Sequence, residues 1–134
     1  MDADNHIREK FNLDDKNPGV LKGIARDGLY RLYAELGYKI GCEVGLEKGK
    51  NAVTMFENIP GLKLFGVDPY IQHPNCSYEA TAQTRNWNQD YLNRVKAQAV
   101  DRMIGRNAVI IEKFSEDAIK DFADNSLDFV YIDA

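Results

Sequence analysis

Two glycines and two acidic residues are spaced as in loops that hold a small polar molecule. Gly45 and Gly49 lie four residues apart, directly after a short apolar run that contains Glu43. Asp68 ends a second apolar run roughly 20 residues later, the spacing of the acidic residue that binds a ribose in nucleotide-binding sheets. Glycines let the backbone approach a ligand closely, and a carboxylate accepts hydrogen bonds from hydroxyl groups. The pattern predicts a binding loop followed by an acidic ligand residue.

This loop does not match either common glycine-rich phosphate loop. A P-loop reads GxxxxGK followed by Ser or Thr, but the run from Gly45 to Asn51 is one residue shorter and lacks the metal-binding hydroxyl. A dinucleotide loop reads GxGxxG, but Glu47 occupies its middle glycine position and would bring a carboxylate close to two phosphates. What remains is a nucleoside-type ligand without a phosphate, with Asp68 on its ribose. S-Adenosylmethionine is such a ligand.

An α/β sheet is needed to bring these residues together. Runs typical of buried strands are found at 40–44, 62–67, 108–112 and 127–132. Apolar residues with helical spacing are found at 21–37, 51–59, 92–103 and 115–122. Ser115 is the expected N-cap of the last helix. Strands that alternate with helices indicate a parallel sheet, which binds ligands beyond the carboxyl ends of its strands.

The chain divides into a lead-in and one domain. Residues 1–20 are polar and include Asn17-Pro18-Gly19, so we expect a loose segment that Phe11 and Leu13 partly anchor. The remaining residues, 21–134, are enough for a single hydrophobic core. Within them, the stretch 68–79 is rich in Pro, Asn and His and is expected to be a loop.

Composition argues against several kinds of partner. The net charge is −4, and the basic residues are scattered, so neither nucleic acid nor an anionic membrane is expected to bind. No stretch approaches the roughly 20 apolar residues of a membrane span, and the polar start lacks a signal-peptide core. Cys42 and Cys76 form no CxxC pair, so a zinc site or disulfide framework is not expected. Together these features favour a cytoplasmic protein.

Four short motifs together resemble a known family. They read Glu43-Val-Gly45-x-x-x-Gly49, Gly66-Val-Asp68-Pro-Tyr70, Ser115-Glu116 and Asp128-Phe-Val-Tyr-Ile-Asp133-Ala134. Each follows or ends a predicted strand, and in this order they resemble the class I S-adenosylmethionine-dependent methyltransferases. The resemblance is closest to the small-molecule type whose fourth strand reads DFVYIDA, and it covers about residues 21–134.

The resemblance implies a role for the first two motifs. Glu43 would help to hold the methionine ammonium, and the loop from Gly45 to Gly49 would abut the methionine moiety. Asp68 would bind the ribose. Pro69 or Tyr70 would lie against the adenine.

Ser115 and Glu116 would lie near the edge of the adenine, although each has a simpler explanation. Ser115 can serve as a helix cap, with or without a ligand. Glu116 stands in the first turn of a predicted helix, where an acid interacts favourably with the helix dipole. Both interpretations stay open for each residue.

Asp133 would lie close to the transferred methyl group. The sulfonium donor is already activated, so transfer mainly requires donor and acceptor to be held in a near-attack geometry. Asp133 is the candidate general base for a hydroxyl acceptor. Asp133 could instead bind a metal, as in some family members. The other expected metal ligands would then follow Ala134. The sequence therefore leaves the metal requirement undecided.

These inferences predict S-adenosylmethionine-dependent methyl transfer to a small-molecule acceptor, such as a sugar or another hydroxyl compound. Two alternatives stay open. A nicotinamide-dependent oxidoreductase domain is disfavoured by Glu47 at the second glycine position. A nucleoside-binding module without activity differs from the main prediction only in catalysis.

The family sheet has seven strands in the order 3-2-1-4-5-7-6. The resemblance therefore implies an α/β, Rossmann-like, doubly wound parallel sheet of which this chain holds the order 3-2-1-4 and lacks the remaining strands. Strand 127–132 would then form an edge, and unpaired strand edges invite pairing with another chain. We expect a chain truncated after its fourth strand that self-associates or is only marginally stable, and that shows little or no methyl transfer by itself even if it binds the donor weakly.

Overall fold

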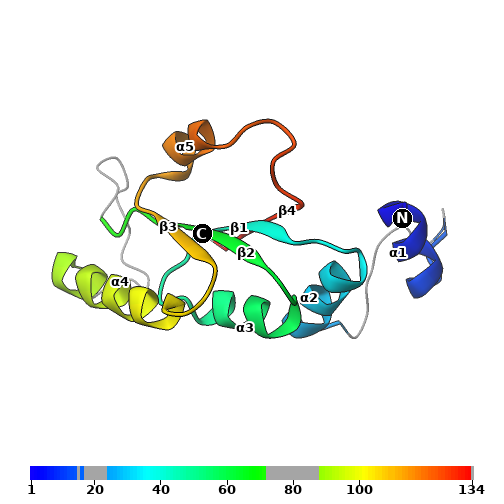
Figure 1. Cartoon of the computed structure of the whole chain (residues 1–134), viewed down its shortest axis with the longest axis horizontal. Helices are drawn as coiled ribbons and strands as arrows, with labels where there is room; N and C mark the ends of the chain where they lie inside the picture. Colours follow the sequence, from blue (N-terminus) through cyan, green and yellow to red (C-terminus); the bar gives the residue numbers. More distant parts are fainter. Residues whose placement is uncertain (15, 17–23, 72–87, 134) are drawn as a thin grey trace.

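A four-stranded parallel sheet forms the centre of the computed structural model, which describes residues 1–14, 16, 24–71 and 88–133. The strands are β1 (Ile40–Val44), β2 (Lys63–Val67), β3 (Ala108–Ile111) and β4 (Phe129–Ile132). Their order is β3-β2-β1-β4, and every neighbouring pair is parallel. The predicted order 3-2-1-4 is confirmed, and the chain has an α/β, Rossmann-like fold (Figure 1).

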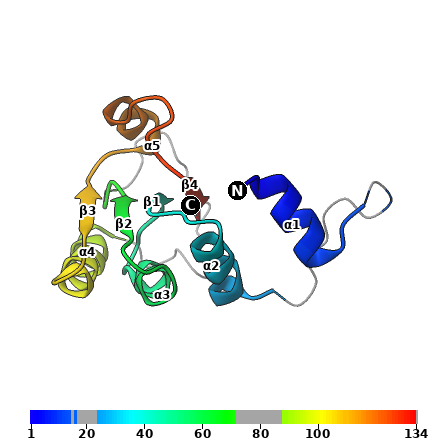
Figure 2. The same cartoon turned by 45° about the vertical axis from the view of Figure 1, so that its right-hand side comes forward.

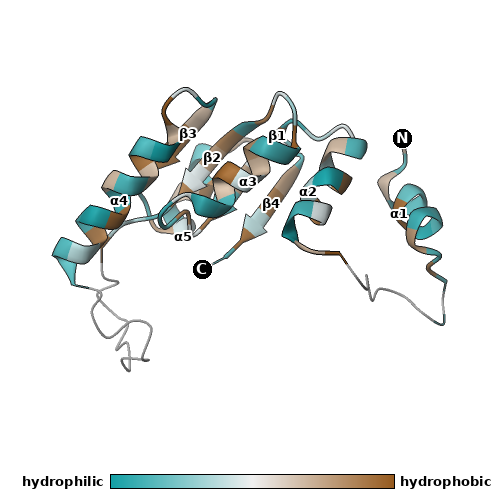
Figure 3. Ribbon diagram, turned by 90° about the horizontal axis from the view of Figure 1, so that it is seen from below, coloured by the Kyte–Doolittle hydropathy of each residue, from teal (hydrophilic) through white to brown (hydrophobic). Residues whose placement is uncertain are grey.

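Three helices cover one face of the sheet, namely α2 (Arg26–Glu35), α3 (Lys50–Asn58) and α4 (Gln89–Met103). Each contributes buried residues to the larger core, among them Tyr30 from α2, Met55 from α3 and Val95 from α4. The predicted apolar stripe of α4 is confirmed, since Val95, Ala99 and Met103 are all buried. Figure 3, viewed from the side of these helices, shows hydrophilic residues on their outward surfaces.

Among the described residues, the opposite face carries one short helical segment, α5 (Ser115–Ala118), which continues as the 3-10 helix η1 (Ile119–Asp121). Ala118 packs there with Cys42 and Val67 in a smaller core. Helices thus lie on both faces, as in a doubly wound sheet. The second face is covered less completely, because Val130 and Ile132 of β4 are 51% and 75% exposed.

Gly41 allows β4 to lie closely against β1. These strands pair at Gly41 and Phe129, and a Cβ at Gly41 would come 2.1 Å from the Phe129 ring. The same ring has its centroid 4.6 Å from that of Tyr33 on α2. Before β4 begins, Asp128 Oδ2 accepts hydrogen bonds from the backbone N–H groups of Lys39 and Ile40, at 2.7 and 2.9 Å. These contacts join the start of β4 to β1 and α2.

Several predicted element boundaries differ from the structure. The helix expected from residue 21 begins at Arg26, after Ala25 in an extended conformation, and residues 17–23 lie outside the described part. Ser115 was expected to be the N-cap of its helix, but Phe114 occupies that position and Ser115 is the first helical residue. The predicted loop at 68–79 is described only as far as Ile71, and Cys76 lies outside the described residues.

The lead-in contains a helix that was not predicted, α1 (Ala3–Phe11). Asp2 caps it, with Oδ1 accepting from the backbone N–H groups of Asp4 and Asn5 at 3.0 and 3.3 Å. Its apolar residues Ala3, Ile7 and Phe11 recur every four residues and are half-buried, but none of its residues is fully buried.

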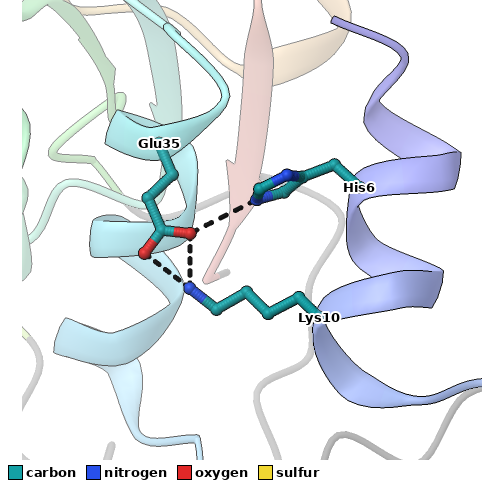
Figure 4. Close-up of polar contacts among 3 residues, drawn as sticks. All are labelled: His6, Lys10 and Glu35. Atoms are coloured by element: carbon teal, nitrogen blue, oxygen red, sulfur yellow. Dashed lines mark hydrogen bonds and ion pairs between the residues drawn. The ribbon is translucent and has the colours of Figure 1, made fainter.

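Helix α1 lies beside α2, beyond the edge of the sheet (Figure 2). Glu35 of α2 joins the two helices through an ion pair with Lys10 and a 3.3 Å contact between its Oε2 and His6 Nε2 (Figure 4). Phe11 and Leu13 are half-buried. His6 and Lys10 of α1 thus both contact Glu35 of α2.

Candidate functional site

The predicted site residues lie where the strands end. Val44 of β1 pairs with the last residues of β2 and β4. Gly45, Asp68 and Asp133, which follow these strands, therefore leave the sheet at the same edge. The backbone N–H of Asp133 donates to the carbonyl oxygen of Val44 at 2.8 Å, and that of Gly45 donates to the last carbonyl of β2 at the same distance. The structure brings these three predicted residues together.

Glu43 is a completely buried carboxyl group at this edge. Its Oε1 accepts a 2.6 Å hydrogen bond from Nδ2 of Asn51. Its Oε2 is buried and has no hydrogen-bond partner within the described residues. Because an unpaired buried acceptor is costly, such an atom in a folded chain indicates a position where a ligand donor could bind.

A second hydrogen bond joins Asn51, the partner of Glu43, to helix α2. The hydroxyl of Tyr30 donates to Oδ1 of Asn51 at 2.6 Å. Tyr30 is completely buried, and Asn51 stands in the first turn of α3. Asn51 therefore accepts with its oxygen and donates with its amide nitrogen, so that its donor end faces Glu43.

Burial raises the pKa of Glu43 to about 7. The hydrogen bond from Asn51 opposes this shift, because it favours the ionised form. Of the nearby charges, Asp133 and Asp68 raise the pKa and Arg26 lowers it. Glu43 therefore changes its charge near neutral pH, and a cation beside Oε2 would hold it ionised.

The loop between β1 and α3 is held in left-handed turns. Gly45, Glu47 and Gly49 have φ angles of 89°, 48° and 73°. The Gly49 N–H donates to the carbonyl of Leu46 at 2.8 Å. The Leu46 side chain packs over Gly66 of β2, where a Cβ would come 2.6 Å from Leu46 Cδ2. Because Gly66 has no side chain, Leu46 can pack closely against β2, and this contact holds the loop in place.

Asp68 fastens the same loop through its two carboxylate oxygens. Oδ2 accepts from the backbone N–H of Glu47, and Oδ1 accepts from that of Tyr70, both at 2.9 Å. A carboxylate has about four acceptor positions, so each oxygen can also accept from a ligand hydroxyl. Asp68 is only half-buried, which leaves it accessible for that purpose.

Tyr70 packs into the core behind the loop. It is 3% exposed, and its hydroxyl donates to the carbonyl of Glu47 at 2.8 Å. Burial raises the pKa of Tyr70 above its ordinary value. Pro69 is half-buried, so it keeps more surface at this position than Tyr70 does.

Ser115 and Glu116 lie at the outer end of the site. They begin α5 after β3, and both side chains are exposed. The end of β3 is next to Asp68, whose N–H donates to the carbonyl of Ile111 at 3.2 Å. In the sheet, β2 lies between β3 and β1. These two residues are thus nearer to the Asp68 end of the site than to Asp133.

Asp133 faces solvent and Arg26, the first residue of α2. The Arg26 guanidinium nitrogen lies 3.8 Å from Asp133 Oδ2, and both side chains are largely exposed. A long, exposed ion pair of this kind contributes little to stability. It leaves the Asp133 carboxylate accessible at the edge of the sheet.

Sequence reasoning missed Arg26, Tyr30 and Asn51 as site residues. A signal existed for Asn51, because a buried acid at the end of a strand needs a donor and the first turn of the next helix is close enough to supply one. Tyr30 lies in a helix with several apolar neighbours, so the sequence predicts only that its side chain packs in the hydrophobic core. Nothing in the sequence pattern indicates Arg26.

Over the described ranges, no group of three or more His, Cys, Asp or Glu side chains is arranged to hold a metal ion. Within the same ranges, no helix combines the length and apolar character needed to cross a bilayer.

No model of a known protein family matches the chain, and no curated protein matches it either. The arguments for function therefore rest on the fold and on the geometry of the site.

Proposed function

We propose that this chain binds S-adenosylmethionine at the carboxyl edge of its sheet and transfers the methyl group to a small-molecule acceptor, such as a sugar or another hydroxyl compound. The observation that carries the proposal is Glu43 Oε2, a buried acceptor without a partner among the described residues. The amino-acid end of S-adenosylmethionine carries an ammonium group, which offers both N–H donors and a positive charge.

Two further features support a nucleoside-type ligand. The turn from Gly45 to Gly49 keeps its left-handed conformation through backbone hydrogen bonds, so its shape exists before a ligand binds. Asp68 has acceptor positions left for two ribose hydroxyls. Glu47 is exposed and would bring a negative charge close to a pyrophosphate, which disfavours a nicotinamide dinucleotide.

Asp133 is the residue that we propose as the general base. The bound donor supplies a methyl group on an already activated sulfonium. Asp133 accepts the proton of an acceptor hydroxyl as the new O–C bond forms and the C–S bond breaks, which leaves a neutral thioether. The exposed carboxylate of Asp133 fits this role because it is accessible from solvent.

Calorimetric titration tests the ligand. S-Adenosylmethionine and S-adenosylhomocysteine are expected to bind to the chain, and NAD is expected not to bind. Tighter binding of NAD would replace the proposal with a dinucleotide site. Because little methyl transfer is expected from the chain by itself, binding of both sulfur nucleosides supports the donor site, and detectable transfer to one of a panel of hydroxyl compounds would exclude a nucleoside-binding module without activity.

We also propose that β4 pairs with a second copy of this chain. In the part of the chain that the structure describes, the outer side of β4 has no strand beside it. Val130 and Ile132 are exposed on this strand. An unpaired strand edge that carries exposed β-branched residues is a template for pairing with another strand.

A further inference from the structure

We infer that Asn51 and Tyr30 are positioning residues, which hold Glu43 so that its Oε2 alone is left to accept the ammonium of the ligand. The inference rests on the proposed function, because it concerns how that ammonium is recognised.

The orientation of the Asn51 amide decides which Glu43 oxygen is available. Its Nδ2 donates to Glu43 Oε1 at 2.6 Å, which occupies that oxygen and leaves Oε2 without a partner in the described residues. A flipped amide would turn Oδ1 toward the Glu43 carboxylate, and two acceptors would then face each other. An ionised Glu43 therefore favours the observed orientation.

Tyr30 also favours this orientation when Glu43 is protonated. A protonated carboxyl could donate to a flipped Asn51, so Glu43 alone does not fix the amide. The Tyr30 hydroxyl already donates to Asn51 Oδ1 at 2.6 Å. That bond is kept only while the amide oxygen points toward α2 and the amide nitrogen points toward Glu43.

The Tyr30 ring is itself fixed by its neighbours. It is completely buried, and its centroid lies 6.2 Å from that of Tyr33 and 5.9 Å from that of Tyr131 on β4. The relay from Tyr30 through Asn51 to Glu43 thus joins α2 and α3 to β1. This partly buried, paired relay holds the Glu43 carboxylate in one orientation.

The test compares two ligands that differ by one group. S-Adenosylhomocysteine carries the ammonium, and its deaminated analogue carries hydrogen in its place. Asn51→Leu is expected to weaken binding of S-adenosylhomocysteine about tenfold, and Tyr30→Phe about threefold, the range expected for one buried hydrogen bond. Neither substitution is expected to change the affinity for the deaminated analogue. Tyr33→Phe, which removes a hydroxyl from the same helix, is the matched control and should bind both ligands as the unmodified chain does.

A pH profile separates positioning from a general structural role. The charged groups that act on Glu43 are Arg26, Asp68 and Asp133, and all three are retained in these variants. Loss of the Asn51 hydrogen bond removes a contact that favours the ionised carboxyl, so the pH below which S-adenosylhomocysteine affinity declines should move upward in Asn51→Leu. A variant that is merely loosened would bind more weakly at every pH without this displacement.

Each outcome of the titrations supports or overturns a specific statement. If the unmodified chain binds neither S-adenosylmethionine nor S-adenosylhomocysteine, the proposed function and this inference are both overturned. If it binds them, but the variants lose affinity equally for both probe ligands or for neither, only the positioning role is overturned. Should Asn51→Leu lack the circular dichroism of the folded chain, Tyr30→Phe decides the question, since it keeps the ring contacts.

Discussion

Glu43 is completely buried, and burial raises its pKa to about 7 from an ordinary value of 4.5. Its folded-state pKa therefore lies above the unfolded one, so the folded chain holds the proton more tightly. The free energy of unfolding should decline as the pH rises from about 4.5 to about 7 and should level off above that range. The pKa difference corresponds to about 3 kcal/mol.

Glu43→Gln isolates this contribution from that of other carboxyl groups. Glutamine does not ionise, so the variant should lack the decline and should be more stable than the unmodified chain at pH 8. Below about pH 4.5 the two should be similar. Urea denaturation at a series of pH values measures the difference, and curves that stay parallel from pH 4 to pH 8 would show that Glu43 is not a buried ionisable group.

The same carboxyl group should link ligand binding to proton release. At pH 6 most of the Glu43 side chains are protonated, so binding of an ammonium should release about one proton per ligand, and at pH 8 almost none. Titration of S-adenosylhomocysteine in buffers of different ionisation enthalpy measures this number. Equal release at both pH values would mean that the ammonium does not meet Glu43.

At the level of residues, spacing predicted Asp68 as a ligand residue and the family resemblance predicted Glu43, and both stay predictions until binding is measured. It did not show that Asp68 also holds Glu47 and Tyr70 through backbone hydrogen bonds. Such bonds depend on the path of the loop in space. Arg26 joins the site only because β4 lies beside β1 and brings Asp133 close to it.

The loop between β1 and α3 depends on how it packs against α4. Gly49 has a φ of 73°, and a Cβ there would lie 3.3 Å from Met103 Cε and 3.5 Å from Ala99 Cα. Gly105 has a φ of 76°, but no atom lies within 4 Å of its Cβ position. These two glycines share a backbone conformation and differ in crowding.

Gly49→Ala is therefore expected to destabilise the chain more than Gly105→Ala. Both substitutions carry the cost of a left-handed alanine, about 1 kcal/mol. Gly49→Ala adds crowding against α4, which we expect to cost about a further 1 kcal/mol. Urea denaturation measures the two free energies of unfolding. Equal losses in the free energy of unfolding would mean that α4 can move away from the new methyl group without an energetic cost.

Elements with an apolar pattern could be predicted, and those without one could not. Strand β1 was predicted at 40–44 and is found at Ile40–Val44, because Ile40, Cys42 and Val44 give this short run an apolar character although it contains Glu43. Helix α1 was missed because polar residues outnumber its three apolar ones, although its cap Asp2 and the spacing of Ala3, Ile7 and Phe11 were visible in the sequence. The helix expected at 115–122 changes to a 3-10 turn at Ile119, a change in hydrogen bonding that apolar spacing does not encode.

In the whole molecule, the two faces of the sheet are covered unequally. Helices α2, α3 and α4 bury one face, whereas α5 and η1 cover only part of the other. Val130 and Ile132 on β4 and Val109 on β3 remain exposed on the second face. The sheet order indicates β3 and β4 as the outer strands of the described sheet.

The proposed pairing through β4 predicts association that depends on concentration. Sedimentation velocity should show dimers or larger species of the unmodified chain. Ile132→Lys should reduce this association, because a charged residue on an edge strand opposes pairing. Val109→Lys changes an exposed residue on the other outer strand and should leave association unchanged. A chain that sediments as a monomer at all concentrations would contradict the proposal.

The attachment of α1 through Glu35 has a consequence for how the chain opens. Exposed ion pairs contribute little to stability, and α1 buries no residue. Helix α1 should therefore unfold locally many times before the sheet opens once. In hydrogen–deuterium exchange, the amides of α1 should exchange much faster than those of β1. Added salt, which screens the charges on Glu35 and Lys10, should speed exchange in α1 and leave the rate in β1 almost unchanged.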